Sequence, residues 1–407
     1  MEHINIDKTV EYFKNGIKKD DLKTGFEAEH FICSDDGNSA DYNTVCFIAK
    51  QLQKDIKNSK DILYNGKYSG FECENYSISF EPSCQFEISI APQKDIFKLF
   101  DIYSDFFEKL NAITKKLNLK IYSVGYHPFK CASELKLNSK ERYKYMDKYF
   151  KTSGTTGKNM MRATCSTQVA IDYTSENDFI KKYRLASVMS PLISLMCDNS
   201  PVFEADKNTM YAVRNYIWNN VDKKRCGTID ELFNKDFGFK KYAEYIYNTP
   251  VILDERDGKT VYTQNSTYAQ IYKDKQITKQ QTEHLLSMFF FDVRLKNYIE
   301  IRMADCMPKE YIFAYVAFIN TVFYGGDGKC ADLIYNNFLN VNETDIEKAK
   351  QQILKYGFNA NVYGKTAYDI LCAVFDTVFL YAGKKTADII KPLYNAVKLK
   401  KTIKEIR

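Results

Sequence analysis

Four short segments of this chain alternate polar and apolar residues, and this period of two limits the fold more than any other feature. In residues 80–90 the odd positions are polar or charged, and the even positions are Phe, Pro, Cys, Phe, Ile and Ile. The same alternation occurs in residues 25–30, 161–173 and 298–305. Because successive side chains of a β-strand point to opposite faces, each segment predicts a strand with one buried face and one wet face.

Helical spacing of apolar residues separates these segments. Apolar residues recur every three or four positions in residues 45–56 and 96–117, and residues 311–323 and 368–381 are largely apolar. An amphipathic basic segment follows from about Ala387. Helices of varied length without a regular βαβ rhythm favour an antiparallel or mixed sheet covered by helices. We find no linker or repeat, and therefore expect a single α+β domain over residues 1–407.

The composition excludes several classes of protein. The chain has 407 residues, 45% of them hydrophobic, which is enough for a packed core. The longest apolar run, residues 311–324, is shorter than the ~20 residues of a membrane span. The amino terminus lacks the features of an export signal, so we expect a cytoplasmic protein without a membrane partner.

Cysteines and charge exclude further functions. The 11 cysteines form no C-x-x-C pair, which argues against a zinc site and a disulfide framework. The net charge of +6 is modest for this length, so nucleic acid is not an expected partner. The sequence leaves a monomer and a homodimer equally open.

Carboxylates gather on the polar faces of the predicted strands. They are Glu27, Glu29, Glu81, Glu87 and Glu300. Taken singly, each strand face could be an ordinary solvated surface. Together the carboxylates would repel one another unless a cation lay between them. Oxygen ligands without clustered His or Cys suit Mg²⁺, which usually also binds phosphate oxygens. The pattern therefore predicts a site for magnesium and a nucleotide.

Arginines and hydrogen-bonding residues share these faces. Arg302 accompanies Glu300, and Arg162 precedes Thr164, Ser166 and Gln168 on the alternating face of its segment. The planar guanidinium group binds carboxylate or phosphate through paired hydrogen bonds. Arg225 lies in an expected loop after a helix, where a surface arginine is an equally good interpretation.

Two further segments are candidates for ligand contacts. Residues 152–158, Thr-Ser-Gly-Thr-Thr-Gly-Lys, look like the phosphate loop of acyl-adenylating enzymes, so Gly154, Gly157 and Lys158 are candidate nucleotide contacts. A flexible connector is the alternative. His127 follows a short expected strand and is a candidate for the rim of the site.

The combined motifs resemble the glutamate–cysteine ligases of the plant and proteobacterial type. The resembling segments are residues 25–29, 85–89 with 91–92, 125–128, 161–169, 199–201, 218–227 and 298–302. The resemblance extends to about residue 308, and the helical part that follows, about 309–407, carries no motif that we can assign. Residues 81–84, Glu-Pro-Ser-Cys, depart from the family pattern, which has glycines in plant enzymes.

The resemblance implies a funnel-shaped antiparallel sheet related to that of glutamine synthetase. It implies two or three Mg²⁺ ions on the five glutamates, with Glu87 also catalytic. It implies glutamate binding by Arg162 and Arg225, and binding of the transferred phosphoryl group and the nucleotide by Arg302. We also predict substrate contacts for a set of neighbouring residues: Gln85, Thr164, Ser166, Gln168, His127 and Trp218.

The implied reaction consumes ATP and joins glutamate to cysteine through γ-glutamyl phosphate, as the first step towards glutathione or a related thiol. Cancelling the charge of two reacting anions is the task that magnesium and arginines would perform. Two alternatives remain open: a γ-glutamyl ligase with another amine acceptor, and a non-catalytic relative that binds ATP or a metabolite.

Overall fold

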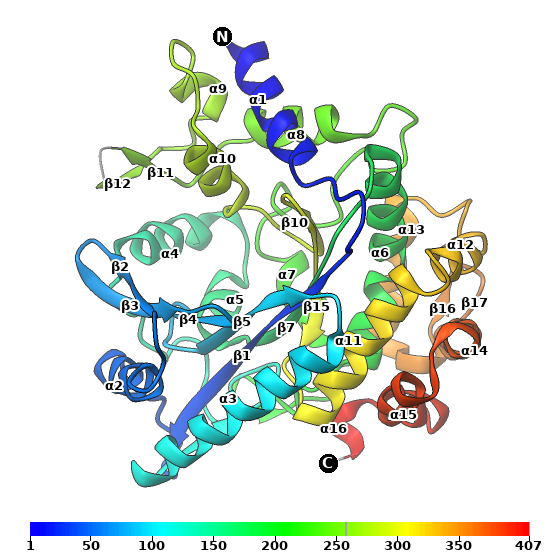
Figure 1. The fold of residues 1–407 in the computed structure, drawn as a ribbon, viewed down its shortest axis with the longest axis horizontal. Coiled ribbons are helices and arrows are strands. Elements are labelled where there is room, and N and C mark those ends of the chain that lie inside the picture. The colour runs from blue at the N-terminus through cyan, green and yellow to red at the C-terminus, as the bar shows by residue number, and fades with distance from the viewer. Residues whose placement is uncertain (257–258, 407) are drawn as a thin grey trace.

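The computed structural model describes residues 1–256 and 259–406 of the chain, and its centre is a nine-stranded sheet (Figure 1). The strand order is β14-β15-β7-β1-β5-β4-β3-β2, and β6 also pairs with β1. Every described pairing in this sheet is antiparallel. The strands are β1 Thr24–Ser34, β2 Lys60–Tyr64, β3 Lys67–Glu72, β4 Tyr76–Phe80, β5 Phe86–Gln93, β6 Leu119–Tyr122, β7 Ser166–Ile171, β14 Val293–Leu295 and β15 Ile299–Asp305. The predicted antiparallel sheet is therefore confirmed.

The described residues also form four two-stranded sheets outside the central sheet. Their strands are β8 Val202–Phe203 with β9 Asp206–Lys207, β10 Cys226–Gly227 with β13 Phe290–Phe291, β11 Leu253–Arg256 with β12 Lys259–Tyr262, and β16 Asn361–Val362 with β17 Lys365–Thr366. Of these pairs, only β10 and β13 run parallel.

Helices cover the apolar face of the sheet. They are α2 Tyr42–Gln53, α3 Ile96–Lys116, α6 Glu176–Met196 and α11 Lys309–Tyr324. Figure 1 shows α3 and α11 lying side by side along the sheet. Helix α3 begins where the Asp95 carboxylate accepts a hydrogen bond from the Phe97 amide at 2.9 Å, which satisfies an otherwise unpaired amide of the first turn. The predicted helices of residues 45–56, 96–117 and 311–323 are thereby confirmed.

The remaining helices surround the sheet and the helices that cover it. They are α1 Glu2–Lys14, α4 Glu141–Ser153, α5 Gly157–Ala163, α7 Val213–Asn219, α8 Phe239–Asn248, α9 Tyr268–Ile271, α10 Lys279–Leu286, α12 Lys329–Tyr335, α13 Glu343–Tyr356, η1 Gly357–Asn359, α14 Ala367–Tyr381, α15 Lys384–Lys398 and α16 Ile403–Ile406. Of these, α12, α13, α14 and α15 pack against α6 or α11. One cluster of buried hydrophobic side chains extends from Ile6 to Ile403, so the last helices pack on the same core as the sheet. Among the described residues, no helix is both long and apolar enough to cross a membrane.

Two of the four strand predictions were wrong in part. Residues 80–90 form a hairpin, in which Phe80 pairs with Phe86 and residues 81–85 make the turn. Cys84 has a φ of 66° there, which no strand residue adopts, so Glu81 lies in a turn. Residues 157–163 form helix α5, and β7 begins only at Ser166. Alternation over a few residues did not distinguish this turn and this helix from strand.

Candidate active site

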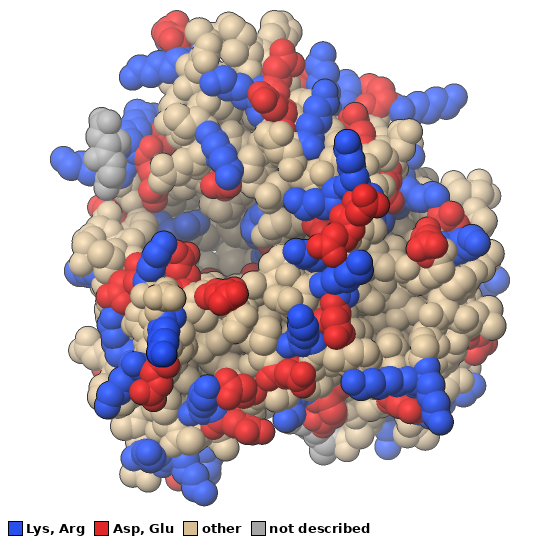
Figure 2. Space-filling view, viewed as in Figure 1, with Lys and Arg blue, Asp and Glu red and all other residues tan. Residues whose placement is uncertain are grey.

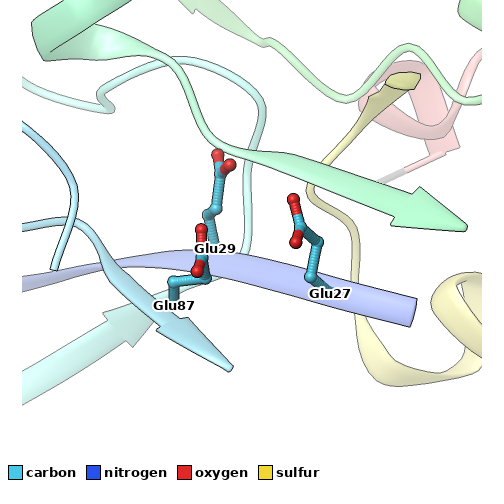
Figure 3. A group of neighbouring side chains, drawn as sticks. All are labelled: Glu27, Glu29 and Glu87. Carbon is cyan, nitrogen blue, oxygen red and sulfur yellow. The ribbon is translucent and has the colours of Figure 1, made fainter. Parts of the chain in front are cut away.

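Three glutamates meet on the polar face of the sheet. In the register of β1 and β5, Glu29 lies opposite Glu87, and Glu27 lies opposite Ser89. Each of Glu27, Glu29 and Glu87 offers a carboxylate oxygen within 4.8 Å of the other two. Figure 3 shows the three side chains projecting to the same side of the two strands. Glu29 and Glu87 are 58 positions apart in sequence, and the pairing of their strands brings their carboxylate oxygens into one compact cluster.

All three carboxyl groups have raised pKa values. Burial, with Glu87 and Glu300 nearby, raises the pKa of Glu27 to about 8. Burial, with Glu81 and Glu87 nearby, raises the pKa of Glu29 to about 8. Burial and Glu81 raise the pKa of Glu87 to about 7. A divalent cation would remove this repulsion, and an all-oxygen donor set suits Mg²⁺.

The other two predicted metal ligands differ from this cluster. Burial also raises the pKa of Glu81, which lines the same cavity from the hairpin turn. Glu300 contacts three cations: Arg294 at 2.6 Å, Lys296 at 3.0 Å and Arg302 at 2.6 Å. Burial would raise its pKa, but these cations outweigh burial and hold it well below its usual range. Glu300 is thus already neutralised by protein groups and does not join the three-glutamate cluster.

Two cavities lie along the polar face and meet at Glu27 and Gln168. The first, here named the carboxylate cavity, has a volume of about 280 Å³. Its lining includes Glu27, Glu29, Glu81, Glu87, Gln168 and Arg302. The second, here named the edge cavity, has a volume of about 340 Å³ and is lined by Tyr76, Ile90, Pro92 and Tyr298 as well as Glu27 and Gln168. Figure 2 shows this face hollowed near its centre, between the positions of α4 and α7 in Figure 1.

Cations that the sequence analysis missed line the carboxylate cavity. They are Arg142, Arg214, Arg294 and Lys296. Arg214 is 5% exposed, and its Nη1 has no hydrogen-bond partner among the described residues. Its guanidinium lies 5.3 Å from the ring of Trp218, one helical turn later on α7. The i, i+4 spacing of Arg214 and Trp218 could have indicated that Arg214 lies on the same helix face as the predicted contact Trp218. Arg294 lies on β14, which has only three residues, and Lys296 directly follows it, so the strand is too short for a period to show.

Arg302 lies on a strand beside Glu300, as the sequence pattern predicted. It lines the carboxylate cavity from β15, and its Nη1 donates to Glu300 at 2.6 Å and also to the Gln168 side chain. The Gln168 amide in turn donates to Glu29 at 3.3 Å. Hydrogen bonds through Gln168 therefore link Arg302 to Glu29 of the glutamate cluster.

The two predicted glutamate-binding arginines lie elsewhere. Arg162 is on helix α5, where it pairs with Asp147 and donates to the Leu135 carbonyl at 3.0 Å. Arg225 is fully buried, binds Asp222 at 2.9 Å and donates to the Pro250 carbonyl. Neither lines the carboxylate or the edge cavity. Arg162 lies on a helix rather than on the predicted strand, so its predicted placement was wrong. Arg225 forms these two contacts within loops.

Gln85, Thr164 and Trp218 line the carboxylate cavity, whereas Ser166 and His127 do not. Gln85 is occupied by the backbone, because its amide donates to the Thr164 carbonyl at 3.2 Å. Ser166 fixes Glu29 by donating its backbone N–H to the carboxylate at 2.7 Å. His127 packs against the Phe31 ring, with its Nε2 2.9 Å from the Ser39 hydroxyl, so the rim position predicted for it was wrong.

The glycine-rich segment 152–158 has a packing explanation. A Cβ on Gly154 would lie 2.1 Å from the Asn220 carbonyl oxygen, and one on Gly157 would lie 2.5 Å from Phe150. Lys158 is exposed. The cavity beside Gly154 shares no lining residue with the carboxylate or edge cavity. The geometry therefore does not support a phosphate loop, because close backbone contacts already account for both glycines.

A sequence model of the glutamate–cysteine ligase family 2 matches residues 24–350 of this chain. The chain belongs to this family. The match begins at β1 and ends within α13, so it contains every strand of the central sheet. The family resemblance drawn from the motifs is therefore confirmed.

Known relatives of the family align along most of the chain. The chloroplastic glutamate–cysteine ligase of Arabidopsis thaliana is 27% identical over 381 residues, which are 91% of this chain and 73% of the relative. The chloroplastic enzyme of Brassica juncea is 28% identical over 80% of this chain, which spans 65% of that relative. Both support the prediction of a ligase.

A solved structure has the same fold. The crystal structure of glutamate–cysteine ligase from Francisella tularensis, in complex with AMP, superposes with a TM-score of 0.59. The two chains are 14% identical, and the superposition covers 96% of this chain and 84% of the other. This likeness confirms the predicted ligase fold.

Proposed function

We propose that this protein uses ATP to join the γ-carboxylate of glutamate to the amino group of cysteine. The observation that carries the proposal is one cavity that holds both a cluster of three glutamates and a group of cations, four arginines and Lys296. The glutamates suit a cation bound to phosphate oxygens, and the cations suit the carboxylates of an amino acid. Membership of the glutamate–cysteine ligase family supports the choice of substrates.

Glu27, Glu29 and Glu87 would hold the magnesium. Their oxygens fit together within 4.8 Å, and their raised pKa values reflect a charge that the cation would balance. When bound, magnesium supplies charge neutralisation at the phosphate oxygens of ATP. Glu81 is close enough to raise the pKa of Glu29 and Glu87 and is a candidate for a further ligand. The number of ions, two or three, stays a prediction from the resemblance.

Glutamate would lie in the carboxylate cavity with its α-carboxylate at Arg214. The Nη1 of Arg214 and the indole N–H of Trp218 have no hydrogen-bond partner within residues 1–256 and 259–406. Both residues line this cavity, and both groups are donors that a carboxylate satisfies. The mostly apolar edge cavity would accept the nucleotide base, between Tyr76, Ile90 and Pro92. The two cavities meet at Glu27 and Gln168, so the γ-phosphate and the γ-carboxylate would approach each other there.

The reaction then proceeds in two displacements. A γ-carboxylate oxygen of glutamate attacks the γ-phosphorus of ATP, the bond to ADP breaks, and γ-glutamyl phosphate forms. The cysteine amino group attacks the acyl carbon, loses its proton, and expels inorganic phosphate. Arg302 lies beside Gln168 and Glu300 at the junction of the cavities, where its fixed charge stabilises the phosphoryl group during transfer.

The acceptor is expected to be cysteine. Met146, Met160, Met161 and Phe290 form an apolar, sulfur-rich part of the carboxylate cavity lining. Thioether sulfur and aromatic rings suit a small polarisable side chain such as a thiol better than a charged one. A location in the cytoplasm and a monomeric or dimeric state are further parts of this proposal.

Phosphate release tests the proposal. Purified protein is incubated with ATP, magnesium and glutamate, together with cysteine, 2-aminobutyrate, alanine or glycine. The proposal predicts phosphate release that depends on glutamate and is fastest with cysteine. Equal rates with alanine and cysteine would exclude the thiol acceptor and favour a ligase with another amine substrate. Release without any glutamate requirement, or no release with any acceptor, would exclude the proposed reaction.

A further inference from the structure

Helix α16 carries Lys404, whose side chain is buried whereas the nearby lysines are exposed. The side chain of Lys404 is 7% exposed, and its Nζ lies 2.9 Å from the Asp198 carboxylate, which is fully buried. The same ammonium group donates to the Met210 carbonyl and lies 5.6 Å from the ring of Tyr211. Lys400 and Lys401, in the same basic segment, are exposed. Lys404 lies beyond residue 350, where the match to the family model ends.

The contacts of Lys404 surround the turn that starts helix α7. The Asp198 carboxylate oxygen that binds Lys404 also accepts a hydrogen bond from the Ala212 amide at 3.0 Å. Ala212 precedes the helix with φ 46° and ψ 48°, a left-handed conformation that is unfavourable for alanine. The ammonium group therefore holds both sides of the turn, at Met210 and, through Asp198, at Ala212.

This turn determines where Arg214 lies. Arg214 is the second residue of α7 and lines the carboxylate cavity, and its Nη1 has no hydrogen-bond partner in the part of the chain that the structure describes. Its Nε donates to the Arg302 carbonyl at 3.3 Å. Because Arg214 is two residues after Ala212, a change in the turn would move its guanidinium relative to the cavity.

Charge links the same groups. Arg214 faces two buried carboxylates: Glu29, which lines the carboxylate cavity, and Asp305, which does not. Asp305 in turn faces both Arg214 and Lys404, and accepts from the Ser200 hydroxyl at 2.7 Å. Without the ammonium of Lys404, Asp198 would lose its ion-pair partner, and Asp305 would be left with Arg214 as its strongest cationic neighbour. That loss would draw the guanidinium away from the cavity and from a bound carboxylate.

We infer that Lys404 is a positioning residue for the amino-acid site: it holds the Met210–Ala212 turn and balances Asp198, so that Arg214 stays directed to the carboxylate of glutamate. The inference rests on the proposed function for its substrate. It assigns a role to the basic segment after α15, for which neither the motifs nor the family match provides one.

Substitution of Lys404 tests the inference. We expect Lys404→Met to raise the KM for glutamate by about tenfold, a loss typical of one charged contact, while the KM for ATP changes less than about twofold. Lys404→Arg should restore most of the affinity for glutamate, because it returns a cation to Asp198. Lys401→Met removes an exposed lysine three residues earlier and should leave both constants unchanged.

A double variant covers the case in which Lys404→Met does not fold because Asp198 is left as an unpaired buried charge. Asp198→Asn/Lys404→Met leaves neither charge at that contact and keeps an oxygen for the Ala212 amide. We expect it to fold and to bind glutamate severalfold more weakly than the wild type, with an unchanged KM for ATP.

The outcomes separate the two proposals. A wild-type protein that releases no phosphate with glutamate overturns the proposed function. An active wild type, with glutamate KM unchanged in Lys404→Met or in the double variant, overturns only the positioning role. Equal changes in the KM for glutamate and for ATP, or a lower melting temperature with no change in either KM, would likewise show that Lys404 is merely structural.

Discussion

Glu29 on β1 lies directly opposite Glu87 on β5. Two carboxylates face each other across neighbouring strands, and Glu27 completes the group within 4.8 Å. Like charges opposite one another destabilise a sheet. The proposed cation, bound between them, would remove this repulsion.

Removing one carboxylate of this group should stop the reaction. Glu87→Gln keeps the shape of the side chain and its acceptor oxygen for the Ser79 hydroxyl, which now lies 2.7 Å away. We expect kcat for ADP formation to fall by about 10² to 10³, as for loss of a preorganised electrostatic group, with the protein still folded. Glu108→Gln, an exposed position on α3, is the matched control and should behave as the wild type.

Arg214 and Arg162 should respond differently to substitution. Arg214→Met removes a cation from the carboxylate cavity and should raise the KM for glutamate by at least about tenfold, the effect of one charge-assisted contact. Arg162→Met leaves the buried Asp147 without its closest partner and should mainly lower the melting temperature. Steady-state kinetics with a thermal melt of each variant make the comparison. The opposite pattern would favour the arginine assignment implied by the resemblance.

Magnesium should stabilise the protein more at high pH than at low pH. Burial and mutual repulsion raise the pKa values of Glu27 and Glu29 to about 8 and of Glu87 to about 7. The folded protein then binds more protons than the unfolded chain, so without metal its stability falls as pH rises from about 4.5 to about 8. The cation competes with these protons. We expect a larger magnesium-induced rise in melting temperature at pH 8.5 than at pH 6, and a smaller rise in Glu87→Gln; equal shifts would contradict a shared site.

His127 should make the protein sensitive to acid. Burial, with Lys130 nearby, lowers its pKa to about 4, although Glu134 acts in the opposite direction. The unfolded chain takes up a proton below about pH 6.5 and the folded protein does not until about pH 4. The stabilising contribution is thus complete above pH 6.5 and is lost as pH falls to 4, by up to about 3 kcal/mol.

His127→Asn isolates this effect. Asparagine can accept from the Lys130 amide, as the His127 Nδ1 does at 3.1 Å, but it does not titrate. Denaturant unfolding at several pH values should show the wild type losing stability relative to the variant between pH 6.5 and 4. Parallel pH profiles would contradict a buried neutral His127. The other groups around it, Cys33 on β1, Ser39 just after β1, and Glu134, are the same in both proteins.

The sequence predicted those parts of the site that lie on long regular strands. Glu27 with Glu29, and Glu300 with Arg302, alternate on strands that the structure confirms. The adjacency of β1 and β5 came only from the family resemblance, because pairing across the chain leaves no local signal. Glu81 shows the limit of alternation, since a turn with Cys84 at positive φ gave the same polar pattern as a strand.

Arginine roles were the least predictable part. The sequence pattern favoured Arg162, but an ion pair with Asp147 on the preceding helix occupies it. Arg214 was missed, although its i, i+4 spacing to Trp218 was a local signal, because its position in the cavity lining depends on the fold. Long-range ion pairs such as Lys404 with Asp198 depend on chain packing and have no signature in the local sequence.

Oxygen transfer from glutamate tests the central claim most directly. The protein is incubated with ATP, magnesium, cysteine and glutamate labelled with ¹⁸O at both γ-carboxylate oxygens, and the products are measured by mass spectrometry. If γ-glutamyl phosphate forms, each γ-glutamylcysteine retains one ¹⁸O and each inorganic phosphate gains one. Unlabelled phosphate, or ADP formed without γ-glutamylcysteine, would contradict the account.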